Sequence, residues 1–127
     1  MFNIPVSNGE LVDKYTILQI KSIKITDIDK LQYINKEILI LNKYIEILKN
    51  NYKLDILIKK LKLVNLQLWD IEDNIRIKEK KKEFDKKFIN LARNVYITND
   101  KRAKIKLDIN KLTKSKLVEI KHYETYL

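Results

Sequence analysis

The 127-residue chain has the length and composition of one soluble domain, with 45% hydrophobic and 35% charged residues, which excludes a disordered protein. One Gly and one Pro leave little punctuation for a sheet with many tight turns, and no apolar run reaches the roughly 18 residues of a membrane span. Zero cysteines exclude disulfides and thiolate metal sites, and a single histidine, His122, excludes His-clustered metal sites and makes Ser-His chemistry improbable.

The net charge of +10 is not by itself a sign of nucleic-acid binding. Of the 27 basic residues only Arg76, Arg93 and Arg102 are arginine, and the lysines are scattered apart from the run Lys78–Lys82. Together with abundant Ile and Asn, this is the composition that an AT-rich genome produces. Non-specific binding of nucleic acid is therefore our third-ranked interpretation. We expect a cytoplasmic protein without a signal peptide or a membrane segment.

The first predicted helix runs over about Asn8–Ile25. Ser7 and Glu10 fit a capping box, with Ser7 as the N-cap and Glu10 at the third helical position. Residues spaced by three and four form its apolar stripe: Leu11, Tyr15, Leu18 and Ile25. A row beside the stripe holds Lys14 and Lys21. We interpret these lysines either as cations that face a ligand or as side chains whose stems cover the core while their heads reach water.

The second predicted helix begins at Asp27 or Asp29. Its apolar stripe has the spacing of a coiled coil: Leu31, Ile34, Ile38, Leu41, Ile45 and Leu48. A second apolar row follows another face of the same helix: Tyr33, Ile40, Tyr44 and Ile47. The helix is therefore predicted to pack on two neighbours. The stretch Asn50–Lys53 breaks the pattern and predicts a short turn into an antiparallel helix.

The third predicted helix runs over about Leu54–Lys80, with this apolar stripe: Leu54, Leu57, Leu61, Val64, Leu68, Ile71 and Ile75. A polar row stands beside it at i, i+4, i+7 and i+11: Asn65, Trp69, Glu72 and Arg76. This row either turns polar groups inward, with Glu72 nearest the core, or ends in a surface Glu72–Arg76 ion pair. The run Lys78–Lys82 predicts a solvated helix end, with phosphate binding as the alternative.

The fourth predicted helix starts near Asp85 and carries this stripe: Phe84, Phe88, Leu91, Val95, Ile105, Ile109 and Leu112. Thr98 and Arg102 occupy the two positions between Val95 and Ile105. Because burying a lone charge is costly, we expect Arg102 to be paired. The alternative is a helix break at Thr98–Asp100, which would free Arg102 from the core.

The polar residues Asn99 and Lys106 flank Arg102 on the same side of this helix. From Ser115 onward the sequence alternates roughly with period two, which predicts an extended tail laid over the bundle. His122, in this tail, is interpreted as a surface residue.

Three strings stand out: S-N-G-E-L-V-D-K-Y-T-I-L-Q-I-K, N-L-Q-L-W-D-I-E-D-N-I-R and Y-I-T-N-D-K-R-A-K-I-K. They resemble a family of short uncharacterised proteins of bacteria and viruses, and the resemblance covers nearly the whole chain. It implies no established activity and brings only an association with genes for sugar polymers. These residues match its motifs: Ser7, Gly9, Glu10, Asp13, Lys14, Lys21, Asn65, Trp69, Glu72, Asp73, Arg76, Asn99, Asp100 and Arg102.

We predict an all-α protein, an antiparallel bundle of about four helices with a short extended C-terminal tail, forming a single domain over residues 1–127. The leading functional hypothesis is that a small ligand binds a polar seam between the first, third and fourth helices. The ligand would bear a phosphate or a carboxylate, with a sugar-linked form as one option. The expected site residues are Lys14, Lys21, Asn65, Trp69, Glu72, Arg76, Asn99, Arg102 and Lys106. Because five of these are cations, an anionic partner is expected.

In the alternative, the same charges form a buried ion network and the protein is a structural or interaction module. The expected members of that network are Arg76, Arg102, Glu72 and Asp100. No metal, cofactor or membrane partner is expected. The sequence leaves open whether a reaction is catalysed and whether the protein is a homodimer.

Overall fold

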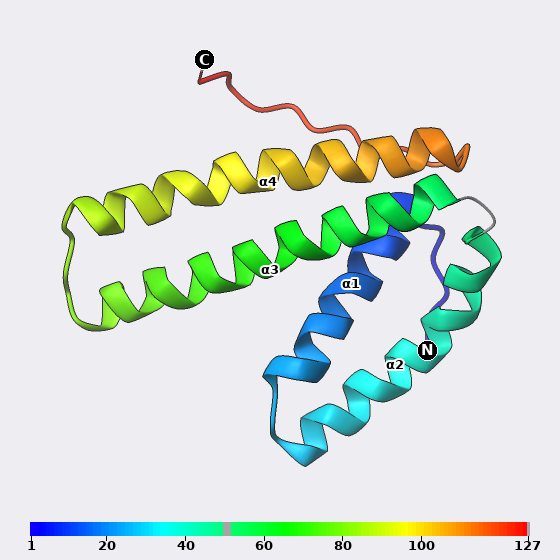
Figure 1. The fold of residues 1–127 in the computed structure, drawn as a ribbon, viewed down its shortest axis with the longest axis horizontal. Coiled ribbons are helices and arrows are strands. Elements are labelled where there is room, and N and C mark those ends of the chain that lie inside the picture. The colour runs from blue at the N-terminus through cyan, green and yellow to red at the C-terminus, as the bar shows by residue number, and fades with distance from the viewer. Residues whose placement is uncertain (50–51, 127) are drawn as a thin grey trace.

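The computed structural model describes residues 1–49 and 52–126, and four helices account for most of them (Figure 1). Their bounds are α1 Asn8–Lys24, α2 Ile28–Leu48, α3 Tyr52–Lys80 and α4 Lys86–Leu112. No strand occurs in these ranges, so the all-α prediction is confirmed. Residues 50 and 51 of the predicted turn lie outside the described residues. None of the described helices is long and apolar enough to cross a membrane.

Three of the helices begin at a side chain that accepts a hydrogen bond from a backbone N–H of the first turn, and these N-caps are Ser7, Asp27 and Asp85. The predicted starts are therefore confirmed. The capping box at α1 forms only in part, because the Glu10 carboxylate accepts a hydrogen bond from Lys106 of α4. A residue placed to cap its own helix thus joins two helices.

The helices form two hairpins that meet at α1 (Figure 1). α3 and α4 lie side by side in opposite directions, while α1 and α2 form a shorter hairpin that diverges from them. α1 packs against α2, α3 and α4, and the main core lies at this junction. Its buried members are Val12, Tyr15, Ile45, Leu54, Ile58, Leu61 and Ile109. Away from the junction, the far ends of both hairpins extend as arms.

α2 departs from its prediction. Its predicted stripe faces the core, with Ile34 and Ile45 buried, but its second apolar row has no neighbour within the described chain. Tyr33 is 80% exposed and Ile47 is 68% exposed. The prediction that α2 packs on two neighbours is therefore wrong within this chain, because the α1–α2 hairpin diverges from α3 and α4.

α4 is one uninterrupted helix, so the alternative of a break at Thr98–Asp100 is wrong, and Thr98 is buried. After α4 the tail carries no helix or strand up to residue 126 and runs back along α4 (Figure 1). Its Tyr126 ring meets the Tyr96 ring of α4 edge to face, with centroids 5.0 Å apart. The predicted tail over the bundle is confirmed, and His122 in it is exposed.

The start of α1 is bound by the end of α4. The Gly9 N–H donates to the side-chain amide oxygen Oδ1 of Asn110 over 2.6 Å, and the Asn8 N–H donates to the Ser115 hydroxyl over 2.9 Å. These bonds satisfy N–H groups that a helix start leaves without partners. The helices approach so closely that a Cβ at Gly9 would lie 2.5 Å from the Lys106 carbonyl oxygen.

We therefore predict that Gly9→Ala destabilises the protein. Helix propensity alone would make alanine about 1 kcal/mol more stable than glycine within a helix. The contact with the α4 backbone forces the helices apart, and we expect a net loss of about 1–3 kcal/mol. Urea unfolding of both chains measures the difference. A midpoint above that of the unmodified chain would contradict this close approach.

Candidate functional site

Asp13 is the centre of a polar cluster where α1, α3 and α4 meet, and only 1% of it is exposed. Arg102 of α4 donates two hydrogen bonds to its carboxylate: Nε lies 3.0 Å from Oδ1, and Nη2 contacts Oδ2. Asn65 of α3 donates to the same Oδ1 over 2.9 Å and to the Thr16 hydroxyl over 3.0 Å. Lys106 Nζ lies 3.8 Å from Oδ2. Groups from two other helices thus satisfy this buried carboxylate.

Lys106 extends the cluster toward the tail. Its ammonium donates to Glu10 of α1 and to Glu119 of the tail, each over 2.8 Å. Burial lowers the pKa of Lys106, but the hydrogen bonds to both carboxylates outweigh burial and leave that pKa raised. The hydrogen bond with Asp13 likewise raises the pKa of Arg102. We call this set the junction network: Glu10, Asp13, Thr16, Asn65, Arg102, Lys106 and Glu119.

The junction network holds three carboxylates and two cations, so it has no excess of positive charge. Two cations, Arg102 and Lys106, meet the carboxylates of Asp13, Glu10 and Glu119, and Lys121 pairs with Glu119 at the rim over 2.7 Å. Among the described residues, every buried side-chain nitrogen or oxygen has a hydrogen-bond partner. The expected excess of cations over carboxylates is therefore absent where these groups converge. No cluster of histidine and carboxylate side chains in the described chain is arranged to hold a metal ion.

Three of the predicted site residues converge in this network: Asn65, Arg102 and Lys106. Lys14 instead faces α2, where its Nζ lies 3.1 Å from Glu37. The others outside the network are Lys21 and Trp69, both half-buried, and Glu72, Arg76 and Asn99, all exposed. Binding of an anionic ligand by these residues stays a prediction.

The Glu72–Arg76 pair lies on the surface of α3. Its two charged atoms are 3.5 Å apart and the Arg76 side chain is 80% exposed. The surface interpretation is confirmed, and the expected place of Glu72 nearest the core is wrong, because 49% of the Glu72 side chain is exposed. The alternative network is correct only for Arg102, since Asp100 instead accepts a hydrogen bond from Tyr126, which raises the pKa of Tyr126.

The periodicity argument missed the central residue of the network, although Asp13 is one of the residues that match the family's motifs. Asp13 lies opposite the predicted stripe of α1, so a search for one apolar face passes over it. The signal that would have found it is a second row at i, i+4, i+7 and i+11, which consists of Gly9, Asp13, Thr16 and Ile20. All four residues are buried. Small and hydroxyl-bearing residues in such a row permit close helix contact.

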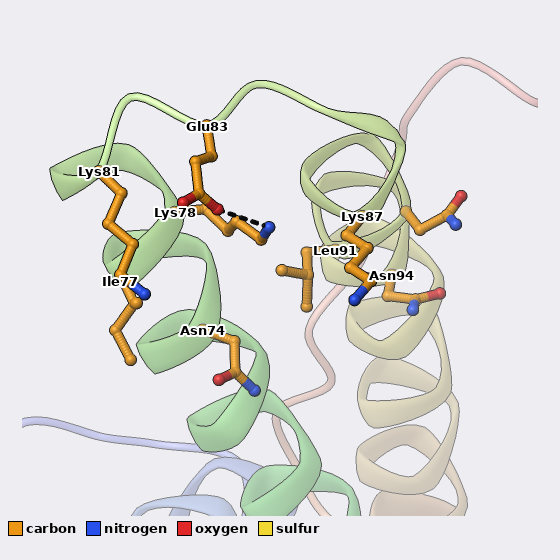
Figure 2. Close-up of a pocket in the computed structure, with 9 residues that line it drawn as sticks. Asn74, Ile77, Lys78, Lys81, Glu83, Lys87, Leu91 and Asn94 are labelled. Carbon is orange, nitrogen blue, oxygen red and sulfur yellow. Dashed lines mark hydrogen bonds and ion pairs between the residues drawn. The ribbon is translucent and has the colours of Figure 1, made fainter.

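A groove of about 430 Å³ lies between the end of α3 and the start of α4, far from the junction network along both helices (Figures 1 and 2). Lys78 stands within it, and its ammonium donates to Glu83 over 2.9 Å and to Asp85 over 2.8 Å. These bonds raise the pKa of Lys78, and the bond from Lys78 lowers the pKa of Asp85. The charge of Lys78 is thereby neutralised within the protein.

Two other lysines of the groove are not neutralised. Lys81, the residue after α3, and Lys87 of α4 line opposite walls, and neither takes part in an ion pair with another described residue. Asn74 precedes Lys81 by two helical turns on α3, and Asn94 follows Lys87 by two turns on α4. The walls thus carry the same two residue types, with Leu91 between them (Figure 2).

We predict that Arg102→Gln destabilises the unliganded protein by about 3 kcal/mol, because it leaves the buried Asp13 carboxylate without its strongest partner. Arg76→Gln is the matched control and should change stability by less than about 0.5 kcal/mol, since its ion pair is exposed. Thermal melts of both variants at one pH separate these values. Equal melting points for the two would show that the junction network does not hold the fold.

The contact between Glu119 of the tail and Lys106 of α4 should be lost at low pH. Hydrogen bonds from Lys106 and Lys121 lower the pKa of Glu119 from 4.5 to about 2. Because the folded pKa is the lower one, the contact stabilises the fold above pH 4.5 and is lost as the pH falls toward 2. Backbone amide shifts of residues 118–120 should move in that window. In Glu119→Gln these three amides should lose that titration, and a wild-type midpoint near 4.5 would contradict the contact.

The chain was compared with protein families, curated proteins and solved structures. No curated protein and no solved structure matches it. A family model does match, over residues 2–127, and therefore includes both the junction network and the groove. The resemblance to a family without an established activity is confirmed to that extent. The chain belongs to DUF6165, a family of unknown function.

Proposed function

We propose that the protein binds a small phosphate- or carboxylate-bearing ligand that also carries hydroxyl groups, such as a sugar phosphate, in the groove between α3 and α4. The observation that carries this proposal is the pair of unneutralised lysines, Lys81 and Lys87, on its facing walls. The ligand class is the one that the sequence predicted, but the location is different. In the junction network the cations already have carboxylate partners.

The charge of the groove favours an anion. Its lining holds Lys78, Lys81 and Lys87 against one carboxylate, that of Glu83. Lys78 is held by Glu83 and Asp85, so the remaining positive charge lies on the other two lysines. An anion placed between them gains two charge-assisted hydrogen bonds and relieves their mutual repulsion. On this proposal, Lys81 of the run Lys78–Lys82 at the end of α3 binds the ligand.

The rest of the lining suits a polyhydroxylated ligand. Asn74, Asn90 and Asn94 offer side-chain amides, which donate and accept hydrogen bonds as hydroxyl groups do. Ile77 and Leu91 provide an apolar surface for the C–H face of such a molecule. The volume of about 430 Å³ falls within the range of about 300–1,000 Å³ that is usual for small-ligand sites.

Titration of ¹⁵N-labelled protein with glucose 6-phosphate, inorganic phosphate and glucose tests the proposal. We expect glucose 6-phosphate to shift the side-chain amide signals of Asn74, Asn90 and Asn94. Inorganic phosphate should bind more weakly and glucose more weakly still, because each offers only part of the contacts. Shifts centred on Arg102 and Lys106 instead would favour the seam between α1, α3 and α4.

Paired variants separate a built groove from a general attraction of anions. Lys81→Gln with Lys87→Gln should weaken binding of glucose 6-phosphate about tenfold or more. Lys80→Gln with Lys86→Gln is the control, since both lysines are exposed in the same region and do not line the groove. Equal losses in the two double variants would overturn the site. Displacement of glucose 6-phosphate by a short mixed RNA would favour nucleic acid.

A further inference from the structure

We infer that the second apolar row of α2 is the contact surface for a second copy of this chain. The row consists of Tyr33, Ile40, Tyr44 and Ile47, which are 80%, 37%, 46% and 68% exposed. Their spacings of seven, four and three residues keep them on one face of the helix, as in a coiled-coil seam. This inference is independent of the ligand proposed for the groove.

The two apolar faces of α2 predict two neighbouring helices, and α1 is its main neighbour within the described chain. A helix that is apolar on two faces is normally buried between two neighbours. The core stripe of α2 rests against α1, with Ile45 fully buried. Large side chains left uncovered in a row are typical of a protein contact, whereas single exposed apolar residues need no explanation.

The accessible surface of the whole chain supports the same conclusion. It amounts to 9655 Å². A compact monomer of 15.3 kDa would expose about 7,100 Å². The excess of about 2,500 Å² is larger than the roughly 800 Å² that each partner buries in a standard stable interface. The exposed row of α2 contributes to this excess, and a contact through α2 would leave the groove at the end of α3 open.

The spacing of the row favours an identical partner. Tyr33 and Ile47 lie seven residues before and after Ile40. When two copies of α2 pair in opposite directions about a two-fold axis at Ile40, each Tyr33 meets Ile47 of the partner subunit. Each Tyr44 then lies opposite Lys36 of the partner subunit. The same patch then serves on both sides, as an isologous interface requires.

Lysines beside the row predict how dimerisation depends on salt concentration. Lys36 and Lys43 lie along one edge, and the two-fold axis brings that edge of each copy together. Salt screens the repulsion between these lysines, so association should strengthen as ionic strength rises. Association driven by attraction between opposite charges would weaken instead.

Sedimentation equilibrium at about 0.1 M and about 1 M NaCl tests the inference. We expect the unmodified chain to reach twice its mass of 15.3 kDa, with the tighter dimer at high salt. Ile47→Asp should raise the dissociation constant about tenfold or more, because it places a carboxylate in the apolar seam. Ile28→Asp is the control: Ile28 is 72% exposed at the start of α2, outside the row and away from Lys36 and Lys43, so dimerisation of this variant should be unchanged.

Three outcomes would overturn the inference: a monomer at both salt concentrations, a dimer that weakens with salt, or equal effects of the two aspartates. Because Ile47 and Ile28 are both exposed, neither variant should disturb the fold. Far-UV circular dichroism and thermal melts check this, since both variants should melt together at a concentration where the protein is monomeric.

Discussion

The buried carboxylate of Asp13 is the constraint on which the arrangement of the helices depends. A carboxylate removed from water is costly unless charged or hydrogen-bonding groups surround it. Its partners Arg102 and Asn65 are 89 and 52 residues away along the chain. α1 therefore docks favourably only where α3 and α4 present both groups at once. The neighbouring apolar contacts of Val12 and Tyr15 are not directional, so the charged contacts fix the register that these apolar contacts then stabilise.

Helix length determines what this junction leaves uncovered. α1 has 17 residues, whereas α3 has 29 and α4 has 27. The far ends of α3 and α4 consequently have no third helix beside them, and lysines there face an open groove (Figure 2). The same short α1 is the main neighbour of α2, which diverges with it and keeps its second face open (Figure 1). Both proposed contact surfaces follow from one central helix that is shorter than its neighbours.

Periodicity predicted the helices well because their starts and apolar spacing are local properties. It also identified Arg102 correctly as a charge at a core position that needs a partner. It failed where the answer depends on which helix lies opposite. α1 touches three helices and is buried nearly all round, so the assumption of one buried face missed Asp13. The same assumption placed Lys14 in the seam with α3 and α4, whereas Lys14 pairs with Glu37 of α2. Glu72 has the right phase for a buried row, but its side chain is 49% exposed.

The ion pairs of the junction network differ from those elsewhere on α3 and α4 in how far apart their members lie in the sequence. Those of the junction network join residues far apart in sequence, as in Asp13 with Arg102 and Glu10 with Lys106. Several pairs elsewhere on α3 and α4 join residues three or four positions apart, and such exposed pairs contribute only a few tenths of a kcal/mol. The described arms therefore share no ion pair with the junction. Charges on the arms can serve a ligand or a second copy without weakening the contacts that hold the fold.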